Sequence, residues 1–461
     1  MRLLIARAAL YFRAMSSSRF GSYFGGIGQA LSIRDYRLYW IGQAVSVQGV
    51  WIQRISAGVL TYQLTQSPGW LGFISFVYVF PLMVCGPVAG AFADRFGHRR
   101  TAILGLSIGV ALSLAMTVLT FAGLMTPHLL AVTIALLGLL HALDFPARQV
   151  LIQLLVGRDR MSAAIALNTT TFNSAAFTGP ALAAALLAFG KAHFGEMGGP
   201  ALGFLVYTLV STWFIVSLIL IRTRDEARKA SSVRKLLADV MEGFVYIRGH
   251  QTILSISVVW FVSSFVIRSY VDLMPGIADS VFNSDEKGLG ILLAASGAGA
   301  LVLSIVMAMR GRTQGLPRLF IAAMVATALA LIVFSVTTNF MVATAAMVVA
   351  GGFSVTASIC GQTIIQSTVD IAFRARVIAV YLSLVIGAQS LGALSLGWIA
   401  EFTGFRWSVG SAAALSLAFI VLAGPGIWRR ARAIEAEAAG PARGGHAPPS
   451  AEPERPRKAA E

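Results

Sequence analysis

Charged residues are scarce in this sequence. Only 12% of its 461 residues are Asp, Glu, Lys or Arg, whereas 57% are hydrophobic and the mean hydropathy is +0.76. A soluble domain cannot bury so large an apolar fraction in one core. Apolar windows recur along the chain, and a helix of about 18 apolar residues or more can cross roughly 30 Å of hydrocarbon. The composition therefore predicts an all-α membrane protein.

Cysteine and the motifs of enzyme active sites are also rare or missing. Cys85 and Cys360 lie in separate apolar segments, without the spacing of a disulfide framework or a metal site. No phosphate-binding Gly-Lys-Ser loop and no nucleophile motif is present. These absences argue against an enzyme, a metal, a cofactor and ATP drive within this chain. The net charge of +16 is better explained by loop bias than by nucleic acid binding.

Apolar windows separated by polar breaks predict twelve transmembrane helices. They fall at 38–64, 70–93, 101–123, 128–147, 163–189, 202–221, 251–274, 288–309, 318–336, 341–369, 378–402 and 409–428.

The connections between these helices divide the chain into five parts. A basic segment over 1–37 is expected to lie on the membrane, with Met15 as an alternative start. Six-helix bundles over 38–221 and 251–428 flank a linker at 222–250, and a tail over 429–461, rich in Pro, Ala, Gly and charge, is expected to be disordered. Within the linker, Leu236, Val240 and Phe244 recur every four residues, which predicts an amphipathic surface helix.

Lysine and arginine are distributed unevenly between the two faces that these helices define. With the N-terminus in the cytoplasm, 31 of the 36 basic residues lie on the cytoplasmic face. The opposite face holds only three, Lys191, Lys287 and Arg406. Cytoplasmic loops carry an excess of Lys and Arg, so we expect both termini to be cytoplasmic. An odd number of helices would destroy this sorting.

The two bundles show traces of an internal repeat. Sliding the chain over itself by 213 residues aligns Gln149 with Gln362 and Gly179 with Gly392. The identities are few, so chance is the alternative explanation. Two parallel six-helix repeats imply a pseudo-twofold axis along the membrane normal, with a cavity between the halves near the midplane.

The stretch GPVAGAFADRFGHRRTAIL, residues 86–104, concentrates charge between two apolar runs. It resembles the signature loop of the major facilitator superfamily, although His98 stands where Arg or Lys is usual. The resemblance implies a latch that joins the two halves on the cytoplasmic side in the outward-facing state and releases them in the inward-facing state. A simple positive-inside loop is the alternative. The residues that match the signature are Gly90, Asp94, Arg95, Gly97, Arg99 and Arg100.

The resemblance extends over roughly residues 31–428 to the branch called transmembrane secretion effectors, which includes an enterobactin exporter. Stretches such as IRDYRLYWIGQAVSVQGVWIQRISAGVLTYQLTQSP carry it. AAFTGPALAA also resembles the antiporter motif of the fifth helix, in which Gly179 and Pro180 match. Ala175, Ala183 and Ala184 replace its outer glycines, and a packing kink is the alternative reading. The branch implies proton-driven export of siderophores, drugs or secondary metabolites.

A few charged residues lie inside the predicted helices, where they usually face a cavity or a partner. Arg268 and Asp272 are four residues apart on one helical face, so we expect them to pair as a strut or a proton-sensitive link. Asp144 and Arg148 repeat this spacing and form a candidate charge relay. The remaining candidates for a substrate or proton cavity are Gln53, Arg54 and Tyr78.

Together these features predict a monomeric transporter of the bacterial cytoplasmic (inner) membrane that alternates access between its two sides. The first hypothesis is export of an amphipathic small molecule by proton antiport. Uptake by proton symport or facilitated diffusion on the same fold is the second. A membrane sensor or assembly factor that transports nothing is the third.

Overall fold

The computed structural model describes residues 25–157, 159–222, 233–267, 269–282, 284, 286–310, 314–370 and 373–429. Several predictions therefore concern residues outside the described part of the chain. These are most of the basic N-terminal segment, the tail beyond residue 429, and Arg268. Residues 223–232 of the linker also lie outside it.

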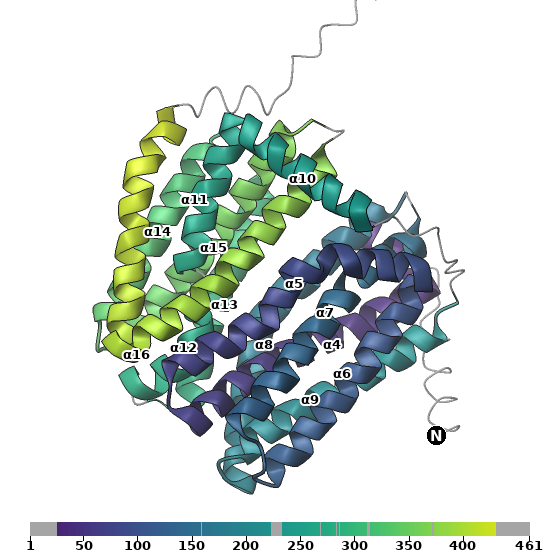
Figure 1. Ribbon diagram of the computed structural model, residues 1–461, viewed down its shortest axis with the longest axis vertical. Helices are drawn as coiled ribbons and strands as arrows, with labels where there is room; N and C mark the ends of the chain where they lie inside the picture. The colour runs from purple at the N-terminus through teal and green to yellow at the C-terminus, as the bar shows by residue number, and fades with distance from the viewer. Residues whose placement is uncertain are drawn as a thin grey trace, which may run out of the picture.

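The first half of the chain forms one bundle of long helices, drawn in purple to blue in Figure 1. A short helix, α3, precedes them, so helical structure begins within the segment that we placed before the first span. The helices are α3 (Gly25–Leu31), α4 (Arg34–Thr65), α5 (Pro68–Phe96), α6 (His98–Phe121), α7 (Pro127–Val156), α8 (Met161–Phe194) and α9 (Gly198–Leu220).

The second half forms a second bundle beside the first, drawn in teal through green to yellow. The predicted seventh span is divided into α11 and α12 and reaches Phe282, eight residues beyond its expected end at 274. The helices of this half are α10 (Val233–Gly249), α11 (Gln251–Ile267), α12 (Tyr270–Phe282), α13 (Glu286–Arg310), α14 (Leu316–Val336), α15 (Phe340–Thr368) and α16 (Arg374–Arg429).

Twelve membrane-crossing segments can be counted in the described residues. Ten helical stretches are long and apolar enough to span a membrane, with α11 and α12 forming one of them. One of the ten contains two spans, because Gly404 interrupts α16 with a left-handed φ of 79°. The remaining span is α4, whose hydropathy is lowered by polar residues such as Gln43, Gln48 and Arg54. The predicted all-α membrane fold is thus confirmed.

The outer surface of the bundles is apolar. Val118, Leu209, Val302 and Leu422 are 59%, 60%, 58% and 82% exposed. Soluble proteins rarely leave such residues in large contiguous patches. Their distribution over the flanks of long helices fits contact with lipid chains, and the protein is a multi-pass membrane protein.

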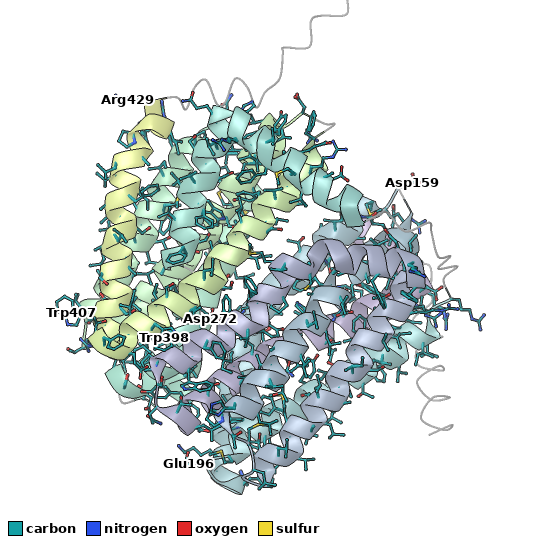
Figure 2. All side chains as sticks on the ribbon, in the orientation of Figure 1. Asp159, Glu196, Asp272, Trp398, Trp407 and Arg429 are labelled. Atoms are coloured by element: carbon teal, nitrogen blue, oxygen red, sulfur yellow. The ribbon has the colours of Figure 1, made fainter. Side chains whose placement is uncertain are left out.

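Two ends of the molecule are distinguished below. The basic end carries α10 and Arg429, at the top of the view, and the turn between α5 and α6, at its right (Figures 1 and 2). The opposite end carries the turn between α4 and α5, and Gly404. Two spans that begin at the opposite end, α5 and α7, have short polar caps: the Ser67 hydroxyl accepts from the Trp70 N–H, and the Thr126 hydroxyl accepts from the Leu129 N–H, both at 3.3 Å. A proline follows each of these caps, where its missing N–H costs nothing.

The two halves meet through equivalent helices. The second span, α5, packs against the first part of α16, and α13 packs against α8. Gly397 of α16 and Ala184 of α8 are 213 residues apart and occupy these two contacts. A Cβ on Gly397 would lie 3.0 Å from the Gly72 Cα, and Ala184 similarly lies against Gly290. These paired contacts are those of two pseudo-symmetric six-helix bundles.

Candidate functional site

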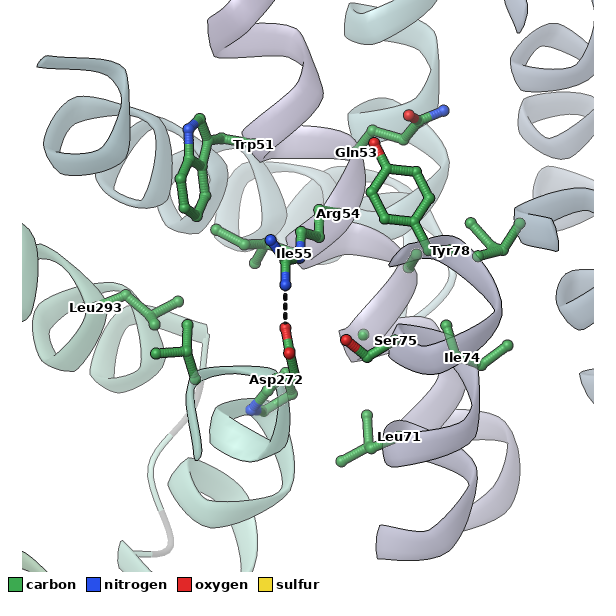
Figure 3. Close-up of a pocket in the computed structure, with 15 residues that line it drawn as sticks. Trp51, Gln53, Arg54, Ile55, Leu71, Ile74, Ser75, Tyr78, Asp272 and Leu293 are labelled. Atoms are coloured by element: carbon green, nitrogen blue, oxygen red, sulfur yellow. Dashed lines mark hydrogen bonds and ion pairs between the residues drawn. The ribbon is translucent and has the colours of Figure 1, made fainter. Parts of the chain in front are cut away.

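A central cavity lies between the two halves (Figure 3). It contains about 690 Å³ of space, part of which is open to solvent. Helices α4 and α5 of the first half and α12 and α13 of the second contribute most of its wall. Apolar side chains cover much of the surface, including Leu71, Ile74, Val271 and Leu293. The polar and aromatic groups on the wall are Trp51, Gln53, Arg54, Ser75, Tyr78 and Asp272.

One ion pair crosses this cavity. The Arg54 guanidinium donates from Nη2 to Oδ1 of Asp272, joining α4 of the first half to α12 of the second (Figure 3). The Asp272 side chain is 5% exposed, and that of Arg54 is 28% exposed. Arg268 lies outside the described residues, so its expected pairing with Asp272 stays a prediction. The partner that the structure shows for Asp272, Arg54, is 218 positions away in the sequence.

Neighbouring side chains hold Arg54 and its helix in place. The Arg54 guanidinium carbon lies 5.9 Å from the centroid of the Trp51 ring, within range of a cation–π contact. Gln53 donates to the Ser113 hydroxyl at 3.3 Å and so faces its own bundle. Gly179 lies against Trp51, where a Cβ would approach the Trp51 Cγ to 2.9 Å. The Gly-Pro pair of the antiporter-like motif thus begins at a close contact between α8 and α4.

A second, smaller cavity of about 350 Å³ lies inside the first bundle. Asp144 and Arg148 form an ion pair within α7 on its wall, as the four-residue spacing predicts, and both are buried. The Tyr78 and His141 rings stack at 6.0 Å between centroids. Gln53 and Tyr78 line both cavities, so they form a shared wall between the Asp144–Arg148 pair and the central cavity.

The opposite end of the interface between the halves is closed. Oε2 of Glu401 accepts from the Gly69 N–H at 2.9 Å and from the Ser67 hydroxyl at 2.7 Å, at the start of α5. A carboxylate is favourable there because the first N–H groups of a helix have no partner within it. Lys191 bridges to Glu286 at 3.4 Å. These contacts join α5 to α16 and α8 to α13.

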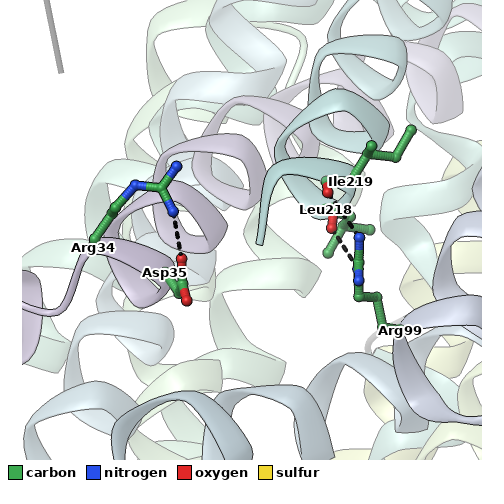
Figure 4. Close-up of polar contacts among 5 residues, drawn as sticks. All are labelled: Arg34, Asp35, Arg99, Leu218 and Ile219. Carbon is green, nitrogen blue, oxygen red and sulfur yellow. Dashed lines mark hydrogen bonds and ion pairs between the residues drawn. The ribbon is translucent and has the colours of Figure 1, made fainter. Parts of the chain in front are cut away.

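Polar groups at the basic end pair within their own half. Asp94 lies 3.5 Å from Nε2 of His98, and Arg99 donates to the backbone carbonyls of Leu218 and Ile219, both at 2.7 Å (Figure 4). Gly97 makes the turn with a φ of 91°. In the part of the chain that the structure describes, Asp94 has no ion-pair partner in the second half.

The other residues of the predicted gating loop are at the surface. Arg95 and Arg100 are exposed. Among the described residues, no atom lies within 4 Å of a Cβ built on Gly90, so this glycine makes no close contact with another described helix. In the second half, Arg376 of α16 is paired with Asp239 at 2.9 Å and Glu242 at 2.8 Å, both on α10. The linker helix is therefore anchored to the second bundle.

Two groups that the structure brings to the interface are not indicated by any sequence motif. Glu401 lies near the end of an apolar run. Only its position, a carboxylate close to the boundary of a predicted span, could have indicated a role. Ser75 lies within an apolar segment, where a lone Ser carries no functional signal. Figure 2 shows Asp272 between the two bundles, with Trp398 and Trp407 at the opposite end.

Twelve spans in two pseudo-symmetric bundles around a central cavity define a secondary transporter of the major facilitator superfamily. The family model described as "Transmembrane secretion effector" matches residues 29–456. The chain belongs to this family, as its sequence motifs suggested.

Curated relatives are distant. The chain is 25% identical over 408 residues to the uncharacterized MFS-type transporter YfiS of Bacillus subtilis (strain 168), covering 82% of this chain and 87% of the relative. It is 23% identical over 265 residues to the Staphyloferrin A transporter of Staphylococcus aureus (strain NCTC 8325 / PS 47). That match spans 56% of this chain and 63% of the relative's length.

Solved structures share the fold. A bacterial homolog of the human lysosomal transporter Spinster, in an inward-facing and unoccupied conformation, has a TM-score of 0.67 at 13% identity, with 87% of this chain and 98% of that chain covered. A D-xylose-proton symporter has a TM-score of 0.65 at 12% identity, with coverage of 83% and 97%.

Proposed function

We propose that this protein exports an amphipathic small molecule, such as a siderophore, a drug or a secondary metabolite, in exchange for protons. It acts as a monomer in the bacterial cytoplasmic membrane, with both termini and the basic end in the cytoplasm. The present structure is then the state whose outer end is closed. Family membership and the distribution of basic residues support this proposal.

The observation that carries the proposal is the Arg54–Asp272 ion pair. It joins the two halves within the cavity, and a buried ion pair is strongly weakened when one partner loses its charge. A proton that binds Asp272 removes the carboxylate charge and releases α12 from α4. Protonation is thereby linked to the relative movement of the halves, which is the requirement for coupled transport.

The Asp144–Arg148 pair extends this link towards the basic end. Both residues lie beside the wall formed by Gln53 and Tyr78, so a rearrangement of α7 changes the shape of the central cavity. The gating loop adds a latch between the halves in the other state, when Asp94 and Arg95 find partners across the interface.

Proteoliposomes with an imposed pH gradient test the proposal. A panel of amphipathic compounds that includes siderophores is added, and a pH-sensitive dye reports proton movement. The wild-type protein is expected to dissipate the gradient with at least one compound, whereas Asp272→Asn does not. Asp279→Asn is the matched control, because Asp279 is exposed on the same helix and outside the cavity.

Direction is measured with the compound that responds. Its accumulation in energised right-side-out vesicles indicates uptake, and its expulsion indicates export. A pH gradient that no compound dissipates contradicts proton antiport. Flux that is unchanged by both Asp94→Asn and Asp272→Asn favours a role other than transport.

A further inference from the structure

Two buried polar atoms in the central cavity lack a hydrogen-bond partner among the described residues. They are Oδ2 of Asp272, whose other oxygen binds Arg54, and the hydroxyl oxygen of Ser75. The Asp272 side chain is 5% exposed and Ser75 is 9% exposed. Buried polar groups are normally hydrogen-bonded. Figure 3 shows both side chains at the same cavity, one from each half of the molecule.

The charge of the cavity wall limits what can bind these two atoms. Among the described residues, Arg54 and Asp272 are the charged residues that line the cavity, and they neutralise each other. A cation at Asp272 or an anion at Arg54 would leave one charge uncompensated in a largely apolar space, which is unfavourable. A neutral hydroxyl or amide can donate to Asp272 without disturbing the ion pair.

The rest of the wall suits an apolar body. Trp51, Leu71, Ile74 and Leu293 surround the polar atoms. The space inside this wall is about 690 Å³, part of which is open to solvent. A ligand that fills this space has one neutral polar group directed at Asp272 and Ser75, and an aromatic or aliphatic remainder.

We propose that the ligand of the central cavity is an electrically neutral amphiphile, anchored by a hydroxyl or amide that donates to Asp272 Oδ2 and hydrogen-bonds to Ser75. This inference rests on the proposed function in one respect, namely that the bound molecule is the cargo. It narrows the cargo class by charge, which neither the family nor the fold determines.

Three matched naphthalene probes test the charge preference: 2-naphthylmethanol, 2-naphthoate and 2-naphthylmethylammonium. Binding to the full chain in lipid nanodiscs at pH 7 is measured by calorimetric titration, and empty nanodiscs correct for partitioning into lipid. The wild-type protein is expected to bind the alcohol about tenfold more tightly than either ion. Ser75→Ala is expected to weaken binding of the alcohol several-fold.

In each of two variants, one of the two charged probes should replace the alcohol as the tightest ligand. Asp272→Asn leaves Arg54 as an unpaired cation, so the carboxylate becomes the tightest probe. Arg54→Gln leaves Asp272 as an unpaired anion, so the ammonium becomes the tightest. Asp279→Asn, outside the cavity, should keep the wild-type order.

The proposal is overturned if the wild-type protein prefers either ion, if it shows no saturable binding of the alcohol, or if the order is unchanged in both charge variants. Failure of the proposed function has a different signature. In that case the probes bind in the expected order, but no compound dissipates a pH gradient in proteoliposomes.

Discussion

The two ends of the interface between the halves are built differently. At the opposite end, backbone contacts through Gly72 and Gly397 and the Glu401 carboxylate join one half to the other. At the basic end, Asp94 and Arg99 bond within the first half, and Arg376 bonds to α10 of the second. Closure of one end thus coincides with internal pairing at the other. The transport mechanism that we propose requires such an asymmetry, because the cavity must not be open at both ends at once.

The largest effect is expected from removing the ion pair near the middle of the interface. Asp272→Asn leaves Arg54 without its partner, and breaking a buried pair costs about 3–5 kcal/mol, less here because Arg54 is 28% exposed. We expect coupled flux to fall about 100-fold. Flux in proteoliposomes measures this, and near-normal flux would show that the pair is only a strut. Asp279→Asn should retain flux.

A larger side chain between the helices at the closed end should separate them. A Cβ on Gly72 would lie 3.0 Å from the Ala393 carbonyl carbon, so Gly72→Val forces α5 and α16 apart. Overpacking of this kind costs about 1–3 kcal/mol, and we expect flux to fall about tenfold.

The opening of this end is measured with the variant Ala400→Cys, whose new thiol is labelled with a membrane-impermeant maleimide. Ala400 is 2% exposed in the present structure. Cys85 and Cys360 are first replaced by Ser. Gly426→Val is the control, because no atom of the described residues lies within 4 Å of a Cβ at that position. Equal labelling in the two variants would contradict a closing role for Gly72.

Removal of a charge from the closed end should have a smaller effect. Glu401→Gln keeps an acceptor for the Gly69 N–H but loses the charge that the start of α5 favours. Because Glu401 is exposed, we expect labelling of the Ala400 cysteine to increase only roughly threefold. Glu401→Ala, which loses the acceptor as well, should label faster than Glu401→Gln. If Glu401→Ala were labelled more slowly than Glu401→Gln, the hydrogen bond between Glu401 and the Gly69 N–H would not be what keeps this end closed.

The smallest effect is expected from a substitution at the basic end, which should decrease the labelling at position 400 where the preceding variants increase it. Among the described residues, Asp94 has no ion-pair partner in the second half, so we expect Asp94→Asn to destabilise mainly the alternative state. We expect labelling of the Ala400 cysteine to decrease roughly twofold, with little change in thermal stability. Increased labelling would show instead that Asp94 stabilises the present state.

Much of the fold could be predicted from the sequence. Apolar windows located the spans because hydrocarbon admits only backbone that satisfies its own hydrogen bonds. The break at Ser269, between α11 and α12, was not predicted, since hydropathy does not register the local geometry of a continuous apolar run.

The candidate site was predicted less completely. The Asp144–Arg148 pair follows from a spacing of four residues on one helix, which is local information. The pairing of Asp272 with Arg54 is long-range, and no spacing rule indicates it. Ser75 and Glu401 acquire their importance only from the residues that face them across the interface.

The sequence by itself determined that this protein lies in a lipid bilayer, how many times it crosses the bilayer and which family it belongs to. These properties depend on the length of apolar segments and on local motifs. Only the tertiary structure decided which charges meet and which end is closed. The Arg54–Asp272 ion pair forms because α4 and α12 bring two opposite charges together, and either charge alone would be costly in so poorly solvated a space. That arrangement depends on the packing of one half against the other.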